Sequence, residues 1–182
     1  MAKLAAKVYG DALFEEAVEK KKVDLLFEEV QQIKVVFSEN EELMQFLTHP
    51  KIVKEEKISV VEKVFLGRIS DDLIGFLTII VDKGRQKEIL PILDYFIGQV
   101  KEYKKIGIVY VTSAIELSET QKARIYEKLQ QTTEFKELEM HYSVEKELIG
   151  GLVIRIGDRV VDSSVRTKLE EMKRELMKLQ LA

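Results

Sequence analysis

The spacing of apolar residues changes once along the chain, near Lys105, and this change constrains the fold more than any other feature. Before it, apolar residues recur every three to four positions, as on one face of a helix. After it come strand-like stretches, beginning with the β-branched and aromatic residues 106–112. The pattern predicts an α + α/β protein of two domains. Residues 1–105 are expected to form a six-helix bundle, and residues 106–182 a small α/β domain ending in an amphipathic helix.

The fifth predicted helix, residues 73–81, is apolar almost all round, as expected of a central, buried element. Ser70, Asp71 and Asp72 supply a cap and two carboxylates for its first turn. The sixth, residues 86–104, contains Pro91, which predicts a kink or a late start.

The first predicted helix carries more apolar surface than one packed face needs. Leu4, Val8 and Ala12 recur at four-residue spacing, and we expect this face to pack inward. The apolar arc of this helix is widened by Tyr9, Leu13 and Phe14. The small residues Gly10 and Ala12 would let another helix come close. Either the arc binds a partner helix or all of it is core, and the pattern alone leaves both open.

In the second half, strands are predicted over 106–112, 138–144, 148–156 and 159–161, with Gly150-Gly151 interrupting the third. A capping-box pattern at residues 118–121 starts a helix between the first two strands. The last predicted helix, Val165 to Leu181, has a narrow apolar seam with spacings of 4, 3, 4 and 3: Val165, Leu169, Met172, Leu176 and Leu179. The seam packs on its own sheet or pairs with a helix of another protein.

Composition excludes several classes of protein. The net charge is −3 and neither half is basic, which argues against a nucleic-acid binder. The absence of cysteine excludes disulfides, thiolate metal sites and a cysteine nucleophile. The longest charge-free apolar run, residues 73–81, is well short of the ~20 residues a membrane span needs. Residues 1–4 resemble neither a signal nor a transit peptide, so we expect a reducing, cytosolic setting.

No pattern assembles an active site. His49 and His141 lack metal-ligand spacing, and both are expected to be solvent-exposed. Gly150, Gly151 and Gly157 do not have phosphate-loop spacing, and a glycine pair within a strand more often marks a bulge or a close backbone approach. Ser163 and Ser164 follow Asp162 without a nearby histidine or a nucleophile-elbow pattern, and Asp162 or Ser163 is expected to cap a helix rather than to catalyse. We therefore predict no catalytic residue, no metal and no cofactor.

Residues 138–157, LEMHYSVEKELIGGLVIRIG, resemble the hallmark stretch of the delta subunit of bacterial F-type ATP synthases, a family that includes the mitochondrial oligomycin-sensitivity-conferring protein. Further matching points lie along nearly the whole chain: residues 9–14 (YGDALF), Gly84-Arg85, Ser113-Ala114, Leu117-Ser118 and residues 162–166 (DSSVR).

The resemblance implies a stator subunit without chemistry of its own, which links the catalytic headpiece to the peripheral stalk and so supports proton- or sodium-driven ATP synthesis. It implies that the first domain binds the N-terminal helices of alpha subunits between its first and fifth helices. The family motif points directly to Tyr9 and Ala12. Helix assignment adds the remaining candidates: Leu13, Phe14, Ile74, Leu77 and Val81.

The second domain of this family joins the b subunits of the peripheral stalk. The residues implied on this chain are Gly150, Gly151, Val165, Leu169, Met172 and Leu176. No nucleic acid and no small-molecule substrate is expected. Contact with the membrane is expected only through the complex, at the cytoplasmic face of a bacterial plasma membrane.

Three other interpretations stay open at this point. A nucleic-acid-binding protein would need a basic stripe, and a small-molecule enzyme would use the turn between Gly150 and Gly157. A scaffold unrelated to ATP synthase would share only the architecture. For the stator interpretation, we expect Ala12→Asp to cost several kcal/mol of headpiece binding, because it places an uncompensated charge in the groove.

Overall fold

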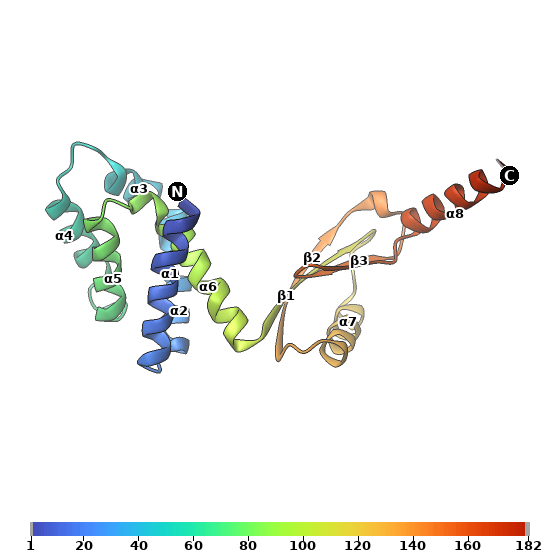
Figure 1. Ribbon diagram of the computed structural model, residues 1–182, viewed down its shortest axis with the longest axis horizontal. Helices are drawn as coiled ribbons and strands as arrows, with labels where there is room; N and C mark the ends of the chain where they lie inside the picture. Colours follow the sequence, from blue (N-terminus) through green and yellow to red (C-terminus); the bar gives the residue numbers. More distant parts are fainter. Residues whose placement is uncertain (1, 181–182) are drawn as a thin grey trace. The chain divides into compact units, whose positions relative to one another are not determined.

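The computed structural model describes the backbone of residues 2–180 and the side chains of residues 4–177 (Figure 1). The fold is α+β: helices come first, then a mixed four-stranded sheet, then a C-terminal helix. Contacts divide the chain into two compact units, and the boundary along the sequence falls between Lys101 and Glu102. That division lies in the last turn of a helix that ends at Lys104, slightly before the predicted domain boundary.

Unit 1 contains six α-helices within the described residues: α1 (Ala2–Glu19), α2 (Val23–Glu39), α3 (Glu41–Thr48), α4 (Lys54–Phe65), α5 (Asp71–Asp82) and α6 (Ile89–Lys104). A short 3₁₀ turn, η1 (Gln86–Glu88), precedes α6. Pro91 therefore lies in the first turn of α6, where its missing N–H breaks no helical hydrogen bond. Of the two outcomes expected at this proline, the structure shows the late start.

The core of unit 1 is built from one face of each of several helices. α2 contributes the stripe Leu26, Val30, Ile33 and Phe37, and α5 and α6 contribute most of the rest. The sequence predicted a buried α5, but the helix is not buried all round. Gly75 and Ile79 are exposed, and 51% of the Ile79 surface is accessible to solvent. α5 therefore has a solvent-exposed side, although most of its residues are apolar.

The face of α1 that was expected to pack inward points outward. Leu4 is 69% exposed, Val8 is 58% exposed, and Ala12 is exposed too. The buried face consists mainly of small residues, with one leucine: Ala5, Ala6, Gly10, Leu13 and Ala17. A Cβ added at Gly10 would stand 2.4 Å from Cδ1 of Tyr95 in α6. At Gly10, therefore, the ring of Tyr95 leaves no room for a larger side chain.

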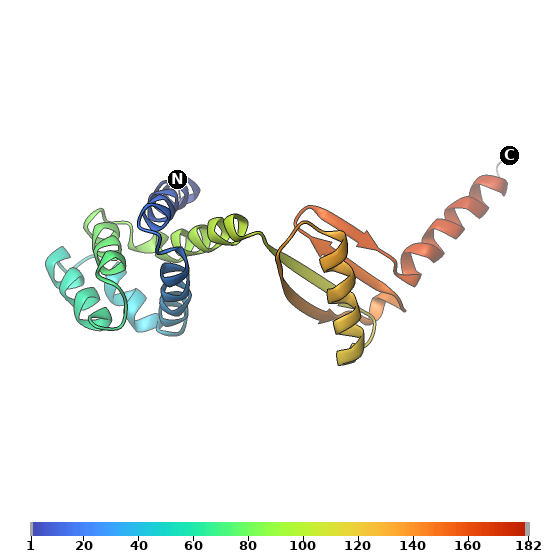
Figure 2. The same ribbon diagram turned by 90° about the horizontal axis from the view of Figure 1, so that it is seen from below.

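Unit 2 is a sheet with a helix on one face. Its elements are β1 (Ile106–Ser113), α7 (Glu119–Thr132), β2 (Glu137–Val144), η2 (Lys146–Leu148), β3 (Leu152–Ile156), β4 (Arg159–Asp162) and α8 (Val165–Gln180). The strand order is β2-β1-β3-β4, with β1 and β2 parallel and the other two pairs antiparallel. α7 joins the parallel strands and covers the face that carries Val109, Val111 and Leu138 (Figure 2).

Local sequence signals explain where several of these elements begin. α7 starts with the predicted capping box, in which Ser118 N–H donates to Gln121 Oε1 (2.9 Å) and Gln121 N–H donates to Ser118 Oγ (3.4 Å). The third strand is shorter than predicted, because Ile149 and Gly151 have φ angles of 65° and 80° and the extended chain begins only at Leu152. The predicted end of the last helix, Leu181, and the side chain of Leu179 lie outside the described residues.

Within residues 2–180, no helix combines the length and the apolar character that crossing a bilayer requires.

Candidate partner-binding surfaces

Side-chain contacts link both ends of α5 to α1, and they show that the two helices run in opposite directions. Just after α1, Lys20 Nζ lies 2.7 Å from Oδ1 of Asp72 in the first turn of α5, and Lys22 Nζ lies 2.7 Å from Oδ2 of the same residue. Towards the other end of α1, the guanidinium of Arg85, just beyond α5, lies 6.0 Å from the centre of the Tyr9 ring. These contacts show that the C-terminal end of α1 meets the N-terminal end of α5.

The lysine contacts also set the charge state of this junction. Hydrogen bonds from Lys20 and then from Lys22 lower the pKa of Asp72 to about 2. Hydrogen bonds to Asp72 and to Glu16 raise the pKa of Lys20. The junction is therefore ionised on both sides at any physiological pH.

On α1, the contact of the Tyr9 ring with Arg85 marks the flank that faces the end of α5. Ala12 is three residues after Tyr9 and lies on the same flank, at the border of the exposed stripe. Phe14 lies five residues after Tyr9, about 140° further round the helix, so it does not share that flank. Leu13 is fully buried, and Tyr9 and Phe14 are partly buried against the core. Of the four predicted α1 residues, Tyr9 and Ala12 are therefore the pair that borders the exposed flank toward α5.

On α5, the predicted residues do not line the flank toward α1. Leu77 and Val81 have no exposed surface. Ile74 is partly buried in a hollow it shares with Ser59, Glu62, Lys63 and Leu66, on the side of α4. Their predicted contact with a partner therefore stays a prediction, and for Leu77 and Val81 it requires the core to open.

Ile79 is the apolar residue that sequence analysis missed. It lies seven residues after Asp72, two helical turns along the same side of α5, and it is 51% exposed. The sequence signal that could have indicated Ile79 is its spacing of seven residues from Asp72, an acidic residue in the first turn of the helix. Leu4, Val8, Tyr9, Ala12 and Ile79 are called the α1–α5 surface below.

Unit 2 exposes an apolar seam on α8. Val165 is 37%, Leu169 51%, Met172 58% and Leu176 63% exposed, and no described side chain of α8 from residue 165 to 177 is buried. Of the two alternatives left open by the sequence, packing of the seam on the sheet of its own unit is therefore wrong. These four residues are called the α8 seam below.

The start of α8 is held by a compact polar cap. Ser164, which is fully buried, accepts a hydrogen bond from Thr167 N–H (3.2 Å), and its own N–H donates to Asp162 Oδ1 (2.8 Å). The Thr167 hydroxyl donates to Asp162 Oδ2 (2.8 Å). These bonds, first the one from the Ser164 N–H, lower the pKa of Asp162. These residues form a helix cap, as expected, but the capping residue is Ser164 and not Asp162 or Ser163, because α8 begins only at Val165.

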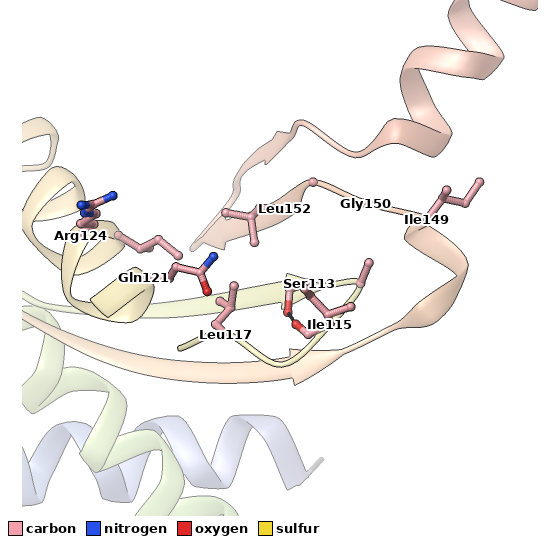
Figure 3. Close-up of a pocket in the computed structure, with 11 residues that line it drawn as sticks. Ser113, Ile115, Leu117, Gln121, Arg124, Ile149, Gly150 and Leu152 are labelled. Carbon is pink, nitrogen blue, oxygen red and sulfur yellow. Dashed lines mark hydrogen bonds between the residues drawn. The ribbon is translucent and has the colours of Figure 1, made fainter. Parts of the chain in front are cut away.

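Gly150 and Gly151 let two stretches of backbone meet where α8 begins. A Cβ on Gly151 would stand 2.3 Å from the carbonyl oxygen of Ser163, and the Val165 N–H donates to Gly150 O (2.9 Å). The pair thus serves a close backbone approach. Together with Ile149 and Leu152, they line one side of a hollow of about 430 Å³. The other side is lined by the end of β1, the β1–α7 connection and α7, as Figure 3 shows: Ser113, Ala114, Ile115, Leu117, Gln121, Arg124 and Ile125.

The chain matches a known protein family over nearly its whole length. The family model for the ATP synthase delta (OSCP) subunit matches residues 5–176. ATP synthase subunit delta of Lachnoclostridium phytofermentans is 54% identical over the whole of both chains, and that of Halalkalibacterium halodurans is 37% identical over 94% of each. The chain belongs to the ATP synthase delta (OSCP) subunit family. The resemblance noted in the sequence is thus confirmed, and with it the function of a stator component of F-type ATP synthase.

A solved structure agrees at the level of the fold. A chain in the mitochondrial ATP synthase hexamer of Toxoplasma gondii superposes with a TM-score of 0.73 over 94% of this delta-family chain and 97% of that chain, at 16% identity. The family is a structural subunit of a membrane-associated complex, so this chain has its partners within ATP synthase.

The histidines of this delta-family chain take part in local contacts. His49 Nδ1 accepts from the N–H of Lys51 (3.3 Å), while His141 lies 3.1 Å from Glu139 and stacks on Tyr110 with 5.0 Å between ring centres. Among the described residues, no three side chains of His, Asp or Glu gather as metal ligands would.

Proposed function

We propose that this delta-family subunit binds the headpiece through unit 1 and the peripheral stalk through unit 2, and so prevents the headpiece from turning with the central stalk. The observation that carries the proposal is that each unit exposes an apolar helix surface: the α1–α5 surface in unit 1 and the α8 seam in unit 2. The subunit has no active site in this proposal. It works at the cytoplasmic face of the plasma membrane, in a complex driven by protons or sodium ions.

The partner of unit 1 is the N-terminal helix of an alpha subunit. Leu4, Val8 and Ala12 form a stripe with four-residue spacing, of the kind that receives the apolar face of a second helix. Tyr9 and Ile79 extend the stripe toward α5. We assign direct contact to these five residues. Leu13, Phe14, Ile74, Leu77 and Val81 hold the helices in place from within a six-helix bundle.

The partner of unit 2 is a helix of the b subunits. The α8 seam has coiled-coil spacing and is uncovered in its own unit, so its free energy of burial is available to a partner. Gly150 and Gly151 contribute by fixing the start of α8 and by lining the hollow beside it. Each unit is in this proposal a separate domain with one partner.

Apolar surfaces suit a joint that works under torque. A subunit that resists rotation must dissociate slowly, and the dissociation rate depends mainly on well-packed apolar anchors. A helix that buries about 1,200–2,000 Å² in total can reach nanomolar affinity, about −12 kcal/mol. Contacts of this kind weaken little with salt, whereas exposed ion pairs are screened.

The test is the formation of a three-part assembly from the full chain, the cognate headpiece and the soluble part of the cognate b subunits, followed by size-exclusion chromatography. We expect headpiece and stalk to co-elute only when the chain is present. Val8→Asp should release the headpiece alone, and Met172→Asp the stalk alone. Co-elution of headpiece and stalk without the chain, or retention of both partners by both variants, would contradict the proposal.

A further inference from the structure

The charges beside the α8 seam are not distributed evenly. In a heptad reading, Leu169 and Leu176 take the a positions and Val165 and Met172 the d positions. The e and g positions, which border the seam, then carry four charged residues within the described side chains, and three are basic: Arg166, Lys168, Lys173 and Glu175. The opposite side carries Glu170, Glu171 and Arg174. The basic excess of α8 therefore lies along the seam.

Two of the basic border residues are free to meet a partner. Arg166 lies 3.4 Å from Glu170 and 3.7 Å from Glu147, so the chain's own carboxylates partly neutralise it. Lys168 and Lys173 have no carboxylate within ion-pair distance among the described residues. A helix lying on the seam would place its own e and g residues next to these two ammonium groups.

A second copy of the chain fits this border poorly. In a parallel pair, a g residue faces the e residue five positions later in the other helix, which sets Lys168 against Lys173. In an antiparallel pair, attraction between Lys168 and Glu175 is offset by repulsion between Arg166 and Lys173. Neither arrangement gains electrostatic free energy, whereas acidic border residues on another protein would gain it in both directions.

The apolar hollow continues the seam at the start of α8. Cγ2 of Val165 lies 3.1 Å from the position a Cβ would take on Gly150, and Gly150 lines the hollow. On its α7 wall, Arg124 is exposed and has no carboxylate partner among the described residues. Seam and hollow together therefore form one apolar surface with unpaired cations along its edge.

We propose that the α8 seam and the adjoining hollow bind an amphipathic helix whose apolar stripe is bordered by acidic residues. This inference rests on the proposed function, and it assigns that chemistry to the stalk segment that unit 2 binds. An apolar side chain near the end of the segment fills the hollow, and an acidic residue beside it meets Arg124.

The experiment compares two neighbouring charge reversals in the full chain. Lys173→Glu changes the border of the seam, and Arg174→Glu makes the same charge change one residue later, on the far side of α8. Isothermal titration with the soluble part of the cognate b subunits should show affinity weakened about threefold or more by Lys173→Glu and unchanged by Arg174→Glu. The difference should shrink as salt is raised.

Two synthetic helical peptides with the same leucine stripe, one bordered by glutamate and one by lysine, test the same point without the b subunits. The glutamate-bordered peptide should bind the wild-type chain more tightly.

Equal effects of the two reversals on b binding would overturn the inference while leaving the proposed function intact. If the b subunits do not bind even the wild-type chain, the stalk part of the proposed function fails. The two peptides then test the inference about the acidic border by themselves. Preference for the lysine-bordered peptide, or no binding of either, then overturns the inference. Self-association in sedimentation that Met172→Asp abolishes would also overturn it.

Discussion

At Gly10, the absence of a side chain makes room for the ring of Tyr95 on the buried face of α1. The face that reads as most apolar in the sequence carries Leu4 and Val8, and a pattern argument places it in the core. The structure instead buries the side with Gly10, where the ring of Tyr95 in α6 occupies the space that a side chain would need. The ring of Tyr95 that occupies this space is tethered at its hydroxyl, which donates to Asp11 (2.9 Å) and accepts from Gln99 (3.1 Å).

We expect Gly10→Ala to destabilise the chain. The added methyl group costs about 1–3 kcal/mol of overpacking against a ring that cannot swing away freely, and this exceeds the ~1 kcal/mol gained in helix propensity. Gly98→Ala in α6 is the matched control, because its Cβ meets nothing within 4 Å, and it should stabilise by up to ~1 kcal/mol. Urea unfolding of both variants gives the two signs, and an equally stable Gly10→Ala would show that α1 and α6 do not pack as closely as described.

The carboxylate of Asp72 makes the junction of α1 and α5 sensitive to acid. Its pKa is about 2 in the folded chain, below the ordinary 3.8, so its stabilising effect is complete above pH ~4 and is lost as the pH falls toward 2. The wild type should therefore be more stable than Asp72→Asn near neutral pH, and the two should converge between pH 4 and 2. Thermal unfolding as a function of pH measures this, with Asp71→Asn as a control that removes a neighbouring acid outside the lysine pair. A difference that persists unchanged at pH 2 would contradict the assignment.

At the scale of elements, the sequence predicted what depends on neighbouring residues. Capping residues and apolar spacing are local, so the helices of unit 1, the capping box of α7 and the final helix all appear where expected. The turn at Ile149 and the inner face of α1 depend on contacts between distant segments, and there the pattern was wrong. Ile79 was missed for the same reason: in an apolar helix, only the tertiary neighbours decide which side is outside.

The cap of α8 provides a test at this scale. Ser164→Ala removes a buried hydroxyl that accepts from Thr167 N–H and donates to the Thr167 hydroxyl. We expect a loss of about 0.5–2 kcal/mol in the stability of unit 2, with fraying of the first turn of α8. Hydrogen exchange of the amides at residues 165–168 should report the fraying. Ser118→Ala, in the more exposed cap of α7, is the comparison, and it should leave exchange in α8 unchanged. Unaltered protection in Ser164→Ala would show that the cap does not set where α8 begins.

For the whole molecule, the important feature is that the α1–α5 surface and the α8 seam belong to different units. Unit 1 keeps its own apolar core and unit 2 a smaller one. A substitution on one surface should therefore leave binding at the other unchanged, because sites that belong to separate cores and share no contacts act independently. Such independence is what a tie between two partners requires.

The most direct measurement is isothermal titration of the full chain with a peptide of the first ~20 residues of the cognate alpha subunit. We expect one-to-one binding at nanomolar to low micromolar affinity, weakened at least tenfold by Ala12→Asp and by Val8→Asp. Val35→Asp, the same change at a valine of α2 that is 50% exposed, should bind as the wild type does. All three variants should fold, since none of these side chains is buried. Tight binding that is indifferent to Ala12→Asp and Val8→Asp would place the alpha helix elsewhere, and no binding to the peptide or to intact headpiece would contradict the tie between headpiece and stalk.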